Sequence, residues 1–253
     1  KEHVALITLN REEAANALNV QMADELMDAA IRCDTEKSVR AVLITAMGKM
    51  FCAGGDLKVF SEAGNEVGVL AKKITTSLHA AVSRFARMAP PLVVAVNGTV
   101  AGGGLSLVLV ADMVLSARSA KFTLAYTRAG LVPDGSSTYF LPRLVGLRRA
   151  KELIFTNRVL NAEEALDWQL INQVLDDELL QGEALKLAKS LADGPLATHG
   201  IVKHLLAESF SNHLESQMEA ESRGLAHALS GEEGQEGMRA FLEKRKPVFP
   251  GHD

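Results

Sequence analysis

The sequence predicts an α/β protein in which buried strands alternate with helices and a helical segment ends the chain. Short, almost wholly apolar runs recur up to residue 175, as is typical of strands in a sheet covered on both faces. Segments with helical periodicity separate these runs. Beyond about residue 178 only helical patterns remain. We therefore expect a sheet-containing core over residues 1–190 and a C-terminal helical region over residues 191–253.

Composition excludes several classes of protein. The 253 residues suit one large domain, and 47% hydrophobic with 23% charged residues is the balance of an ordinary globular protein. A net charge of -4 predicts no nucleic-acid partner and no anionic membrane partner. The two cysteines, Cys33 and Cys52, form no disulfide framework. The N-terminal residues lack the layout of a secretory signal, so we expect a cytoplasmic protein.

The first half of the chain predicts three strands and two long helices. The strands are expected at 4–10, 39–46 and 92–98, and the helices at 21–34 and 71–89. Pro90 and Pro91 end the second helix. We expect a turn-rich loop at 48–58 and a mobile polar segment at 61–69.

The second half predicts a buried helix, three more strands and then helices. The apolar stretch 90–117 contains Asn97, Ser106 and Asp112, which a membrane span tolerates poorly. We interpret it as a strand, a glycine turn and a helix over 101–112. Strands are expected at 113–117, 121–125 and 171–175, and helices at 134–146, 148–157, 161–170, 178–193 and 195–209, with a last helix that closes with residues 238–247. Trp168 is expected in the core.

Two glycine-rich turns are candidates for binding negative charge. FCAGGD at 51–56 follows a buried strand, and VNGTVAGGGLS at 96–106 joins a strand to a helix. Glycine lets backbone N–H groups approach a ligand closely, although a plain tight turn or close strand–helix packing explains each segment equally well. The second turn is not a dinucleotide fingerprint, because Leu107 stands where the third glycine belongs. It is not a nucleophile elbow either, because Val108 stands where that motif needs glycine.

Asp134 is the third candidate. It follows Pro133 and precedes a helical pattern, so the residues alone favour a helix N-cap over a catalytic carboxylate. No metal site is predicted, because the seven histidines have no zinc-ligand spacing. We interpret these histidines as ordinary surface or packing residues.

Taken together, these segments show that the chain resembles members of the enoyl-CoA hydratase/isomerase (crotonase) superfamily. The resemblance rests on the order and spacing of the segments at 7–11, 51–58, 95–117, 130–146, 161–175 and 241–249. It implies a crotonase-type spiral of ββα units followed by a C-terminal helical region that forms trimers, often paired as hexamers.

The resemblance also implies an acyl-CoA thioester substrate. Its carbonyl would lie between the N–H groups of Gly55 and Gly103, which form an oxyanion hole. Ala53, Asp56 and Leu57 would contact the coenzyme A part, mostly through backbone. No cofactor is expected beyond the coenzyme A of the substrate.

The acid–base residues point to one branch of the family. Hydratases carry two glutamates, and this chain has Ser106 and Tyr126 at those positions. Asp134 occupies the position of the catalytic aspartate in the branch that includes dienoyl-CoA isomerases and 1,2-epoxyphenylacetyl-CoA isomerases. The resemblance therefore favours catalysis by Asp134 and an isomerase of fatty acid or phenylacetate metabolism. A hydratase using Tyr126, Ser106 or a water chain and a non-catalytic acyl-CoA-binding protein remain the alternatives.

Overall fold

A five-stranded parallel sheet forms the centre of the protein. The computed structural model describes residues 3–251. The strands follow the spatial order β1-β2-β4-β6-β9, and all neighbours are parallel. Their bounds are β1 Val4–Leu9, β2 Ala41–Ala46, β4 Leu92–Val96, β6 Met113–Ala117 and β9 Gln173–Leu175. Every residue of β2 and β4 is buried, which confirms that these apolar runs are covered on both faces.

A second, four-stranded sheet is built from short strands that follow those of the first. Its order is β3-β5-β7-β8, and only the β7–β8 pair is antiparallel. The bounds are β3 Met50–Cys52, β5 Thr99–Ala101, β7 Lys121–Thr123 and β8 Leu160–Asn161. Three successive turns of the chain each contribute one strand to each sheet. The pairs are β2 and β3, β4 and β5, and β6 and β7. This is the expected ββα spiral.

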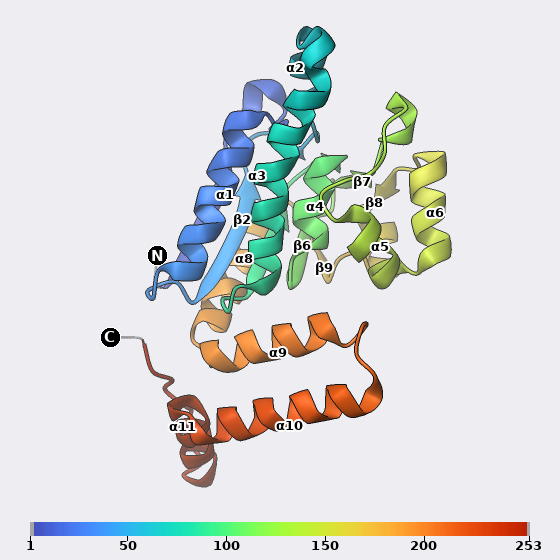
Figure 1. The fold of residues 1–253 in the computed structure, drawn as a ribbon. Helices are drawn as coiled ribbons and strands as arrows, with labels where there is room; N and C mark the ends of the chain where they lie inside the picture. The colour runs from blue at the N-terminus through green and yellow to red at the C-terminus, as the bar shows by residue number, and fades with distance from the viewer. Residues whose placement is uncertain (1–2, 252–253) are drawn as a thin grey trace.

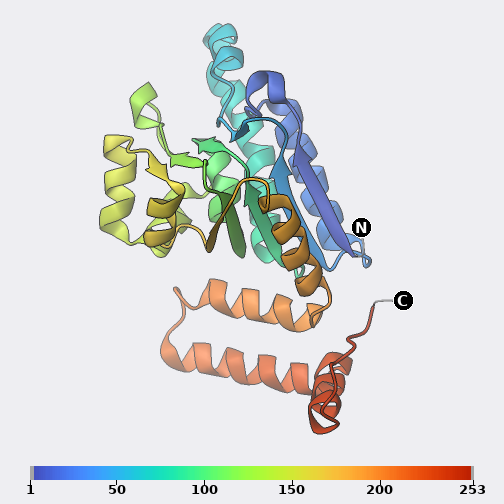
Figure 2. The same cartoon turned by 180° about the vertical axis from the view of Figure 1, so that it is seen from behind.

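Helices cover both faces of the five-stranded sheet. Helices α1 (Val20–Thr35) and α3 (Val67–Arg87) pack side by side on one face (Figure 1). Helix α8 (Leu180–Ala192) lies on the other face, which Figure 2 brings to the front. Helix α4 (Gly103–Leu109) is buried at every residue. The remaining helices of this part are α2 Leu57–Glu62, α5 Ser137–Val145, α6 Leu147–Thr156 and α7 Ala162–Asp167.

The C-terminal helices form a separate layer beneath the sheets in both views. Helices α9 (Leu196–Glu208) and α10 (Leu214–Ser230) run alongside each other, and α11 (Glu232–Leu242) follows (Figures 1 and 2). Lys203 of α9 anchors this layer through a 2.7 Å ion pair with Asp112. The domain boundary at residue 190 stays a prediction.

Three local predictions are wrong. The predicted loop at 48–58 contains β3 and the first residues of α2. The polar segment 61–69 is helical for most of its length, because α2 leads through a short 3-10 helix, Gly64–Glu66, directly into α3. Helix α5 begins at Ser137 and not at residue 134. Trp168 is buried, as predicted. Within residues 3–251, every helix is too short or too polar to cross a membrane.

Candidate active site

The spiral brings the two glycine turns into direct contact. The first follows β3 and the second joins β5 to α4. A Cβ atom added to Gly54 would lie 3.0 Å from the carbonyl oxygen of Ala101 and 3.2 Å from the nitrogen of Gly103. Gly54 also has a backbone φ of +91°, a conformation that residues other than glycine rarely adopt. Glycine is therefore required at this point for the two turns to meet.

The two predicted oxyanion-hole donors lie in these turns. On either side of Gly55, the amide of Ala53 donates to Ala15 and that of Asp56 donates to Leu18. Within the described part of the chain, the N–H groups of Gly55 and Gly103 have no hydrogen-bond acceptor. Gly103 opens α4, where the geometry of a helix leaves the first amides unpaired. The arrangement supplies two unpaired backbone donors on touching turns.

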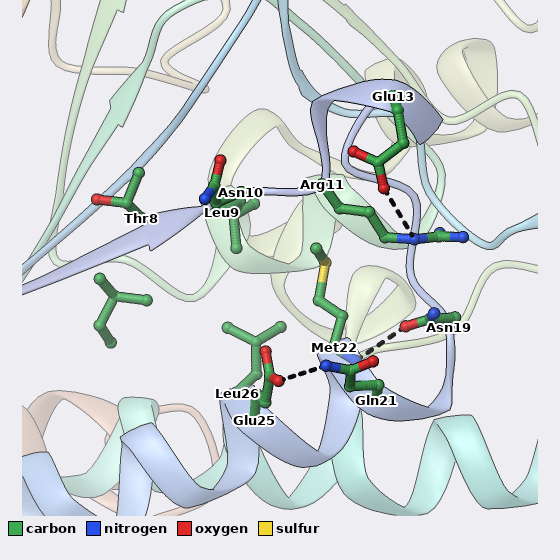
Figure 3. Close-up of a pocket in the computed structure, with 11 residues that line it drawn as sticks. Thr8, Leu9, Asn10, Arg11, Glu13, Asn19, Gln21, Met22, Glu25 and Leu26 are labelled. Carbon is green, nitrogen blue, oxygen red and sulfur yellow. Dashed lines mark hydrogen bonds and ion pairs between the residues drawn. The ribbon is translucent and has the colours of Figure 1, made fainter.

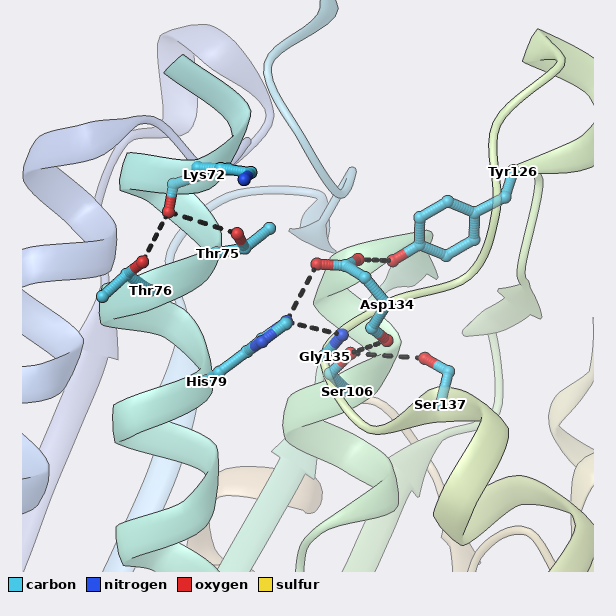
Figure 4. Close-up of polar contacts among 9 residues, drawn as sticks. All are labelled: Lys72, Thr75, Thr76, His79, Ser106, Tyr126, Asp134, Gly135 and Ser137. Atoms are coloured by element: carbon cyan, nitrogen blue, oxygen red, sulfur yellow. Dashed lines mark hydrogen bonds and ion pairs between the residues drawn. The ribbon is translucent and has the colours of Figure 1, made fainter. Parts of the chain in front are cut away.

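The Asp134 carboxylate is held beside these turns by side-chain contacts. The Tyr126 hydroxyl donates to Oδ1 at 2.5 Å, and His79 Nε2 lies 3.2 Å from Oδ2 (Figure 4). The same Tyr126 oxygen lies 3.5 Å from the position of a Cβ on Gly103, which places the carboxylate next to the second turn. The Asp134 side chain is 29% exposed.

The helix-cap interpretation of Asp134 is wrong. The N-cap of α5 is Ser136, and no side chain makes a cap hydrogen bond there. Both carboxylate oxygens of Asp134 instead meet groups outside α5. Pro-Asp-Gly is nevertheless a turn, and the Asp134 carbonyl accepts the Ser137 amide. The side chain is thus directed toward the site while the backbone makes the turn.

The Tyr126 hydroxyl keeps its proton and so remains a hydrogen-bond donor. Burial raises the pKa of its phenol well above the ordinary value, and the neighbouring Asp134 charge raises that pKa further. The hydroxyl therefore stays protonated near neutral pH and orients the carboxylate.

Ser106 supports the backbone of the Asp134 turn. Its side chain is fully buried, and its hydroxyl donates to the Asp134 carbonyl at 3.4 Å and lies 3.3 Å from Ser137 Oγ. A Cβ on Gly135 would lie only 2.2 Å from Ser106 Oγ. Residue 135 must therefore be glycine for the turn to pack against Ser106.

His79 is a member of the site that the sequence prediction missed. It projects from α3 toward Asp134, and its Nε2 also accepts the Gly135 amide at 3.1 Å (Figure 4). The interpretation of all histidines as ordinary residues is wrong here. The available signal was weak: His79 follows Leu78 at the border of the apolar stripe of its helix.

The predicted coenzyme A contacts lie on the first turn and at the start of α2. The Asp56 side chain caps α2 by accepting the amides of Lys58 and Val59, and it pairs with Arg11 at 2.7 Å. Burial raises its pKa, but these donors outweigh that effect and the pKa is lowered. Leu57 is 58% exposed. Any contact of Ala53, Asp56 or Leu57 with a ligand stays a prediction and would use their backbone.

The two cysteines are unsuited to nucleophilic chemistry. Burial raises the pKa of Cys52 to about 12 and that of Cys33 to about 11, so both thiols stay protonated. Both are free and buried. Cys52 instead packs against α4, because a Cβ on Gly104 would lie 2.6 Å from its sulfur. Within the described residues, no three His, Cys, Asp or Glu side chains gather as metal ligands.

A separate cleft of about 300 Å³ lies outside this site. It is lined by the end of β1, the loop after it and the first turns of α1 (Figure 3). Some of its polar groups contact one another: Gln21 donates to Glu25 at 2.8 Å, and the Asn19 side chain caps α1 by accepting the Met22 amide. No predicted site residue lines it.

Comparison with known proteins identifies the family. The model of the enoyl-CoA hydratase/isomerase family matches residues 1–252, and the chain belongs to this family. It is 36% identical over 249 residues to 1,2-epoxyphenylacetyl-CoA isomerase of Escherichia coli (strain K12), covering 98% of this chain and 95% of that protein.

Two further proteins are similar over almost the whole chain. A protein of Rhodobacter capsulatus named "Probable enoyl-CoA hydratase" is 40% identical, covering 99% of this chain and 95% of that one. The crystal structure of an enoyl-CoA hydratase from Polaromonas sp. JS666 superposes with a TM-score of 0.93 at 30% identity, covering 98% of this chain and 96% of that one. The fold is thus the crotonase fold, and the relatives carry both isomerase and hydratase names.

Proposed function

We propose that the protein is an acyl-CoA double-bond isomerase that converts a 3-enoyl-CoA into a 2-enoyl-CoA. The observation that carries this proposal is the position of the Asp134 carboxylate, which lies next to the turn with the unpaired Gly103 amide, and that turn touches the turn with the unpaired Gly55 amide. Membership of the enoyl-CoA hydratase/isomerase family supports an acyl-CoA substrate. Gly55, Gly103 and Asp134 are the proposed catalytic residues.

The first step is removal of a proton from the α-carbon of the thioester. The Asp134 carboxylate accepts this proton, and the electrons move onto the thioester oxygen to give an enolate. The amides of Gly55 and Gly103 stabilise the oxygen, since preorganised donors act where charge develops. Loss of one such donor typically costs about 3–4 kcal/mol of barrier.

The second step returns a proton to the γ-carbon. Protonated Asp134 donates it, the double bond moves to the 2,3-position, and the thioester carbonyl re-forms. The Tyr126 hydroxyl holds Oδ1 throughout, so that the carboxyl group keeps its orientation between the two carbons. One carboxyl group serves first as base and then as acid.

Hydration is disfavoured by the residues around Asp134. It requires one group to activate water and another to manage the α-proton. Ser106 is fully buried and hydrogen-bonded to the Asp134 backbone. The raised pKa of Tyr126 keeps its hydroxyl protonated near neutral pH, so it is not available as a general base. Neither residue replaces the glutamate that a hydratase carries at its position.

The test is turnover of a 3-enoyl-CoA by the wild type and by Asp134→Asn. We expect the variant to lose about 10²–10⁴-fold in kcat, the usual contribution of a positioned acid or base. Asp34→Asn is a matched control, because Asp34 is 25% exposed and pairs with Arg84 elsewhere in the fold. Its turnover should equal that of the wild type.

Other substrates separate the alternatives. A thioester with a ring-derived acyl group, compared with an aliphatic one, tests the phenylacetyl-CoA prediction, which the similarity to 1,2-epoxyphenylacetyl-CoA isomerase supports. Unchanged isomerisation by Asp134→Asn contradicts the mechanism, and efficient hydration of crotonyl-CoA would favour a hydratase. Acyl-CoA binding in calorimetry without conversion of any enoyl thioester indicates a non-catalytic binding protein.

We further propose that the chain assembles as a homotrimer, or as a hexamer of two trimers. Large apolar side chains in the C-terminal helical region support this. Leu206, Phe210, Leu225, Phe241 and Leu242 are each more than 60% exposed in the single chain, which is typical of a surface covered by another subunit. The mass of the purified protein in solution tests this; a monomer contradicts it.

A further inference from the structure

His79 makes two contacts through the same ring nitrogen. Nε2 lies 3.2 Å from Asp134 Oδ2 and 3.1 Å from the Gly135 amide nitrogen. The other ring nitrogen, Nδ1, has no hydrogen-bond partner within residues 3–251. The imidazole is 50% exposed, whereas the Asp134 side chain is 29% exposed. His79 therefore connects the less exposed carboxyl group with solvent.

The two contacts place opposite demands on Nε2. Accepting the Gly135 amide requires a lone pair on Nε2, whereas contacting an ionised carboxylate oxygen favourably requires a proton on Nε2. A neutral imidazole with its proton on Nδ1 satisfies Gly135 and can also accept from a protonated Asp134. An imidazole protonated on Nε2 satisfies the ionised Asp134 instead. The favourable protonation state of His79 thus changes with that of Asp134.

We propose that His79 is a positioning and proton-relay residue that exchanges the proton held by Asp134 with solvent. This inference rests on the proposed isomerase function. Asp134 first takes the α-proton from the substrate. The Oδ2–H bond then breaks as an Nε2–H bond forms, which leaves a carboxylate and an imidazolium ion. The imidazolium exchanges protons with solvent, and the reverse transfer to Asp134 supplies the proton delivered to the γ-carbon.

The test is incorporation of deuterium during isomerisation in ²H₂O. A 3-enoyl-CoA is converted under initial-rate conditions, and NMR measures the deuterium content at the γ-carbon of the product. We expect extensive incorporation by the wild type. In His79→Gln the amide group keeps one donor and one acceptor but carries no titratable proton. Incorporation should fall several-fold, while isomerisation continues by direct return of the substrate proton.

A second histidine–carboxylate pair provides the matched control. His204 Nε2 lies 3.3 Å from Glu208 on α9, and His204→Gln should incorporate as much deuterium as the wild type. His79→Asn is the second variant, and it should reproduce the low incorporation of His79→Gln.

The outcomes separate this inference from the proposed function. If both His79 variants are active and their product contains as much deuterium as the wild-type product, the relay proposal is refuted and the isomerase proposal stays intact. If the wild type isomerises no 3-enoyl thioester, the proposed function fails and the relay fails with it. A loss of turnover in both variants with unchanged incorporation per turnover assigns His79 a structural role only and also overturns the relay.

Discussion

Replacing Gly104 by alanine should destabilise the protein and displace an oxyanion-hole donor. Gly104 is the second residue of α4, directly after Gly103. A Cβ at this position would lie 2.6 Å from both Cβ and Sγ of Cys52 and 2.9 Å from the Cys52 carbonyl oxygen. Rotation of the Cys52 side chain moves only the sulfur, so the backbone of β3 or α4 has to shift.

The expected magnitude follows from two opposing effects. Exchanging glycine for alanine within a helix stabilises by about 0.5–1 kcal/mol. Overpacking a rigid core typically costs about 1–3 kcal/mol, and contact with backbone atoms puts Gly104→Ala at the upper end. The net loss is therefore about 2 kcal/mol. For a chain of this size, each kcal/mol shifts the midpoint of thermal unfolding by about 2–4 °C.

Urea unfolding and isomerase turnover measure the two consequences separately. Gly182→Ala is the control, since Gly182 lies within α8 and a Cβ there meets no atom within 4 Å. It should raise the free energy of unfolding slightly and leave turnover unchanged. Gly104→Ala should lower both. A Gly104→Ala protein as stable as the wild type would refute the proposed contact between β3 and α4.

Two further predictions concern single hydrogen-bonded groups. Tyr126→Phe removes the donor to Asp134 Oδ1, so kcat should fall by about tenfold, as expected for a contact worth about 1.5 kcal/mol to a charged group; equal kcat values contradict the orienting role. The second concerns Glu236, whose pKa falls from 4.5 to about 2 because Arg245 and the Val248 amide hold its charged form. A lowered folded-state pKa gives stability that is complete above pH 4.5 and is lost as pH falls toward 2. The hydrogen-exchange protection factor of the Val248 amide should therefore fall only across that window, and a constant protection factor would contradict it.

The sequence predicts the glycine turns better than it predicts the groups around Asp134. The apolar runs predict the buried strands β2 and β4, and the glycine clusters that come shortly after them mark the two turns, although the short strands β3 and β5 in between were not predicted. The contacts of Asp134 join α3, the segment after β7 and the turn before α5, and no local pattern encodes their meeting. The cap prediction failed because Pro-Asp-Gly has the same local chemistry whether the carboxylate faces a helix end or a neighbouring chain segment. The expected loop at 48–58 failed because tertiary pairing with β5 makes a strand of only three residues, Met50–Cys52.

The turn that presents Asp134 packs directly against Ser106, which leaves no room for a side chain at residue 135. A Cβ added to Gly135 would lie 2.2 Å from Ser106 Oγ and 2.8 Å from Ser106 Cβ. The turn that presents Asp134 therefore requires glycine at 135, and the Ser106 hydroxyl supports it by donating to the Asp134 carbonyl. A glutamate at 106 would replace the hydrogen bond that Ser106 makes to the Asp134 carbonyl and would add a buried charge beside that turn, where an unpaired charge is costly.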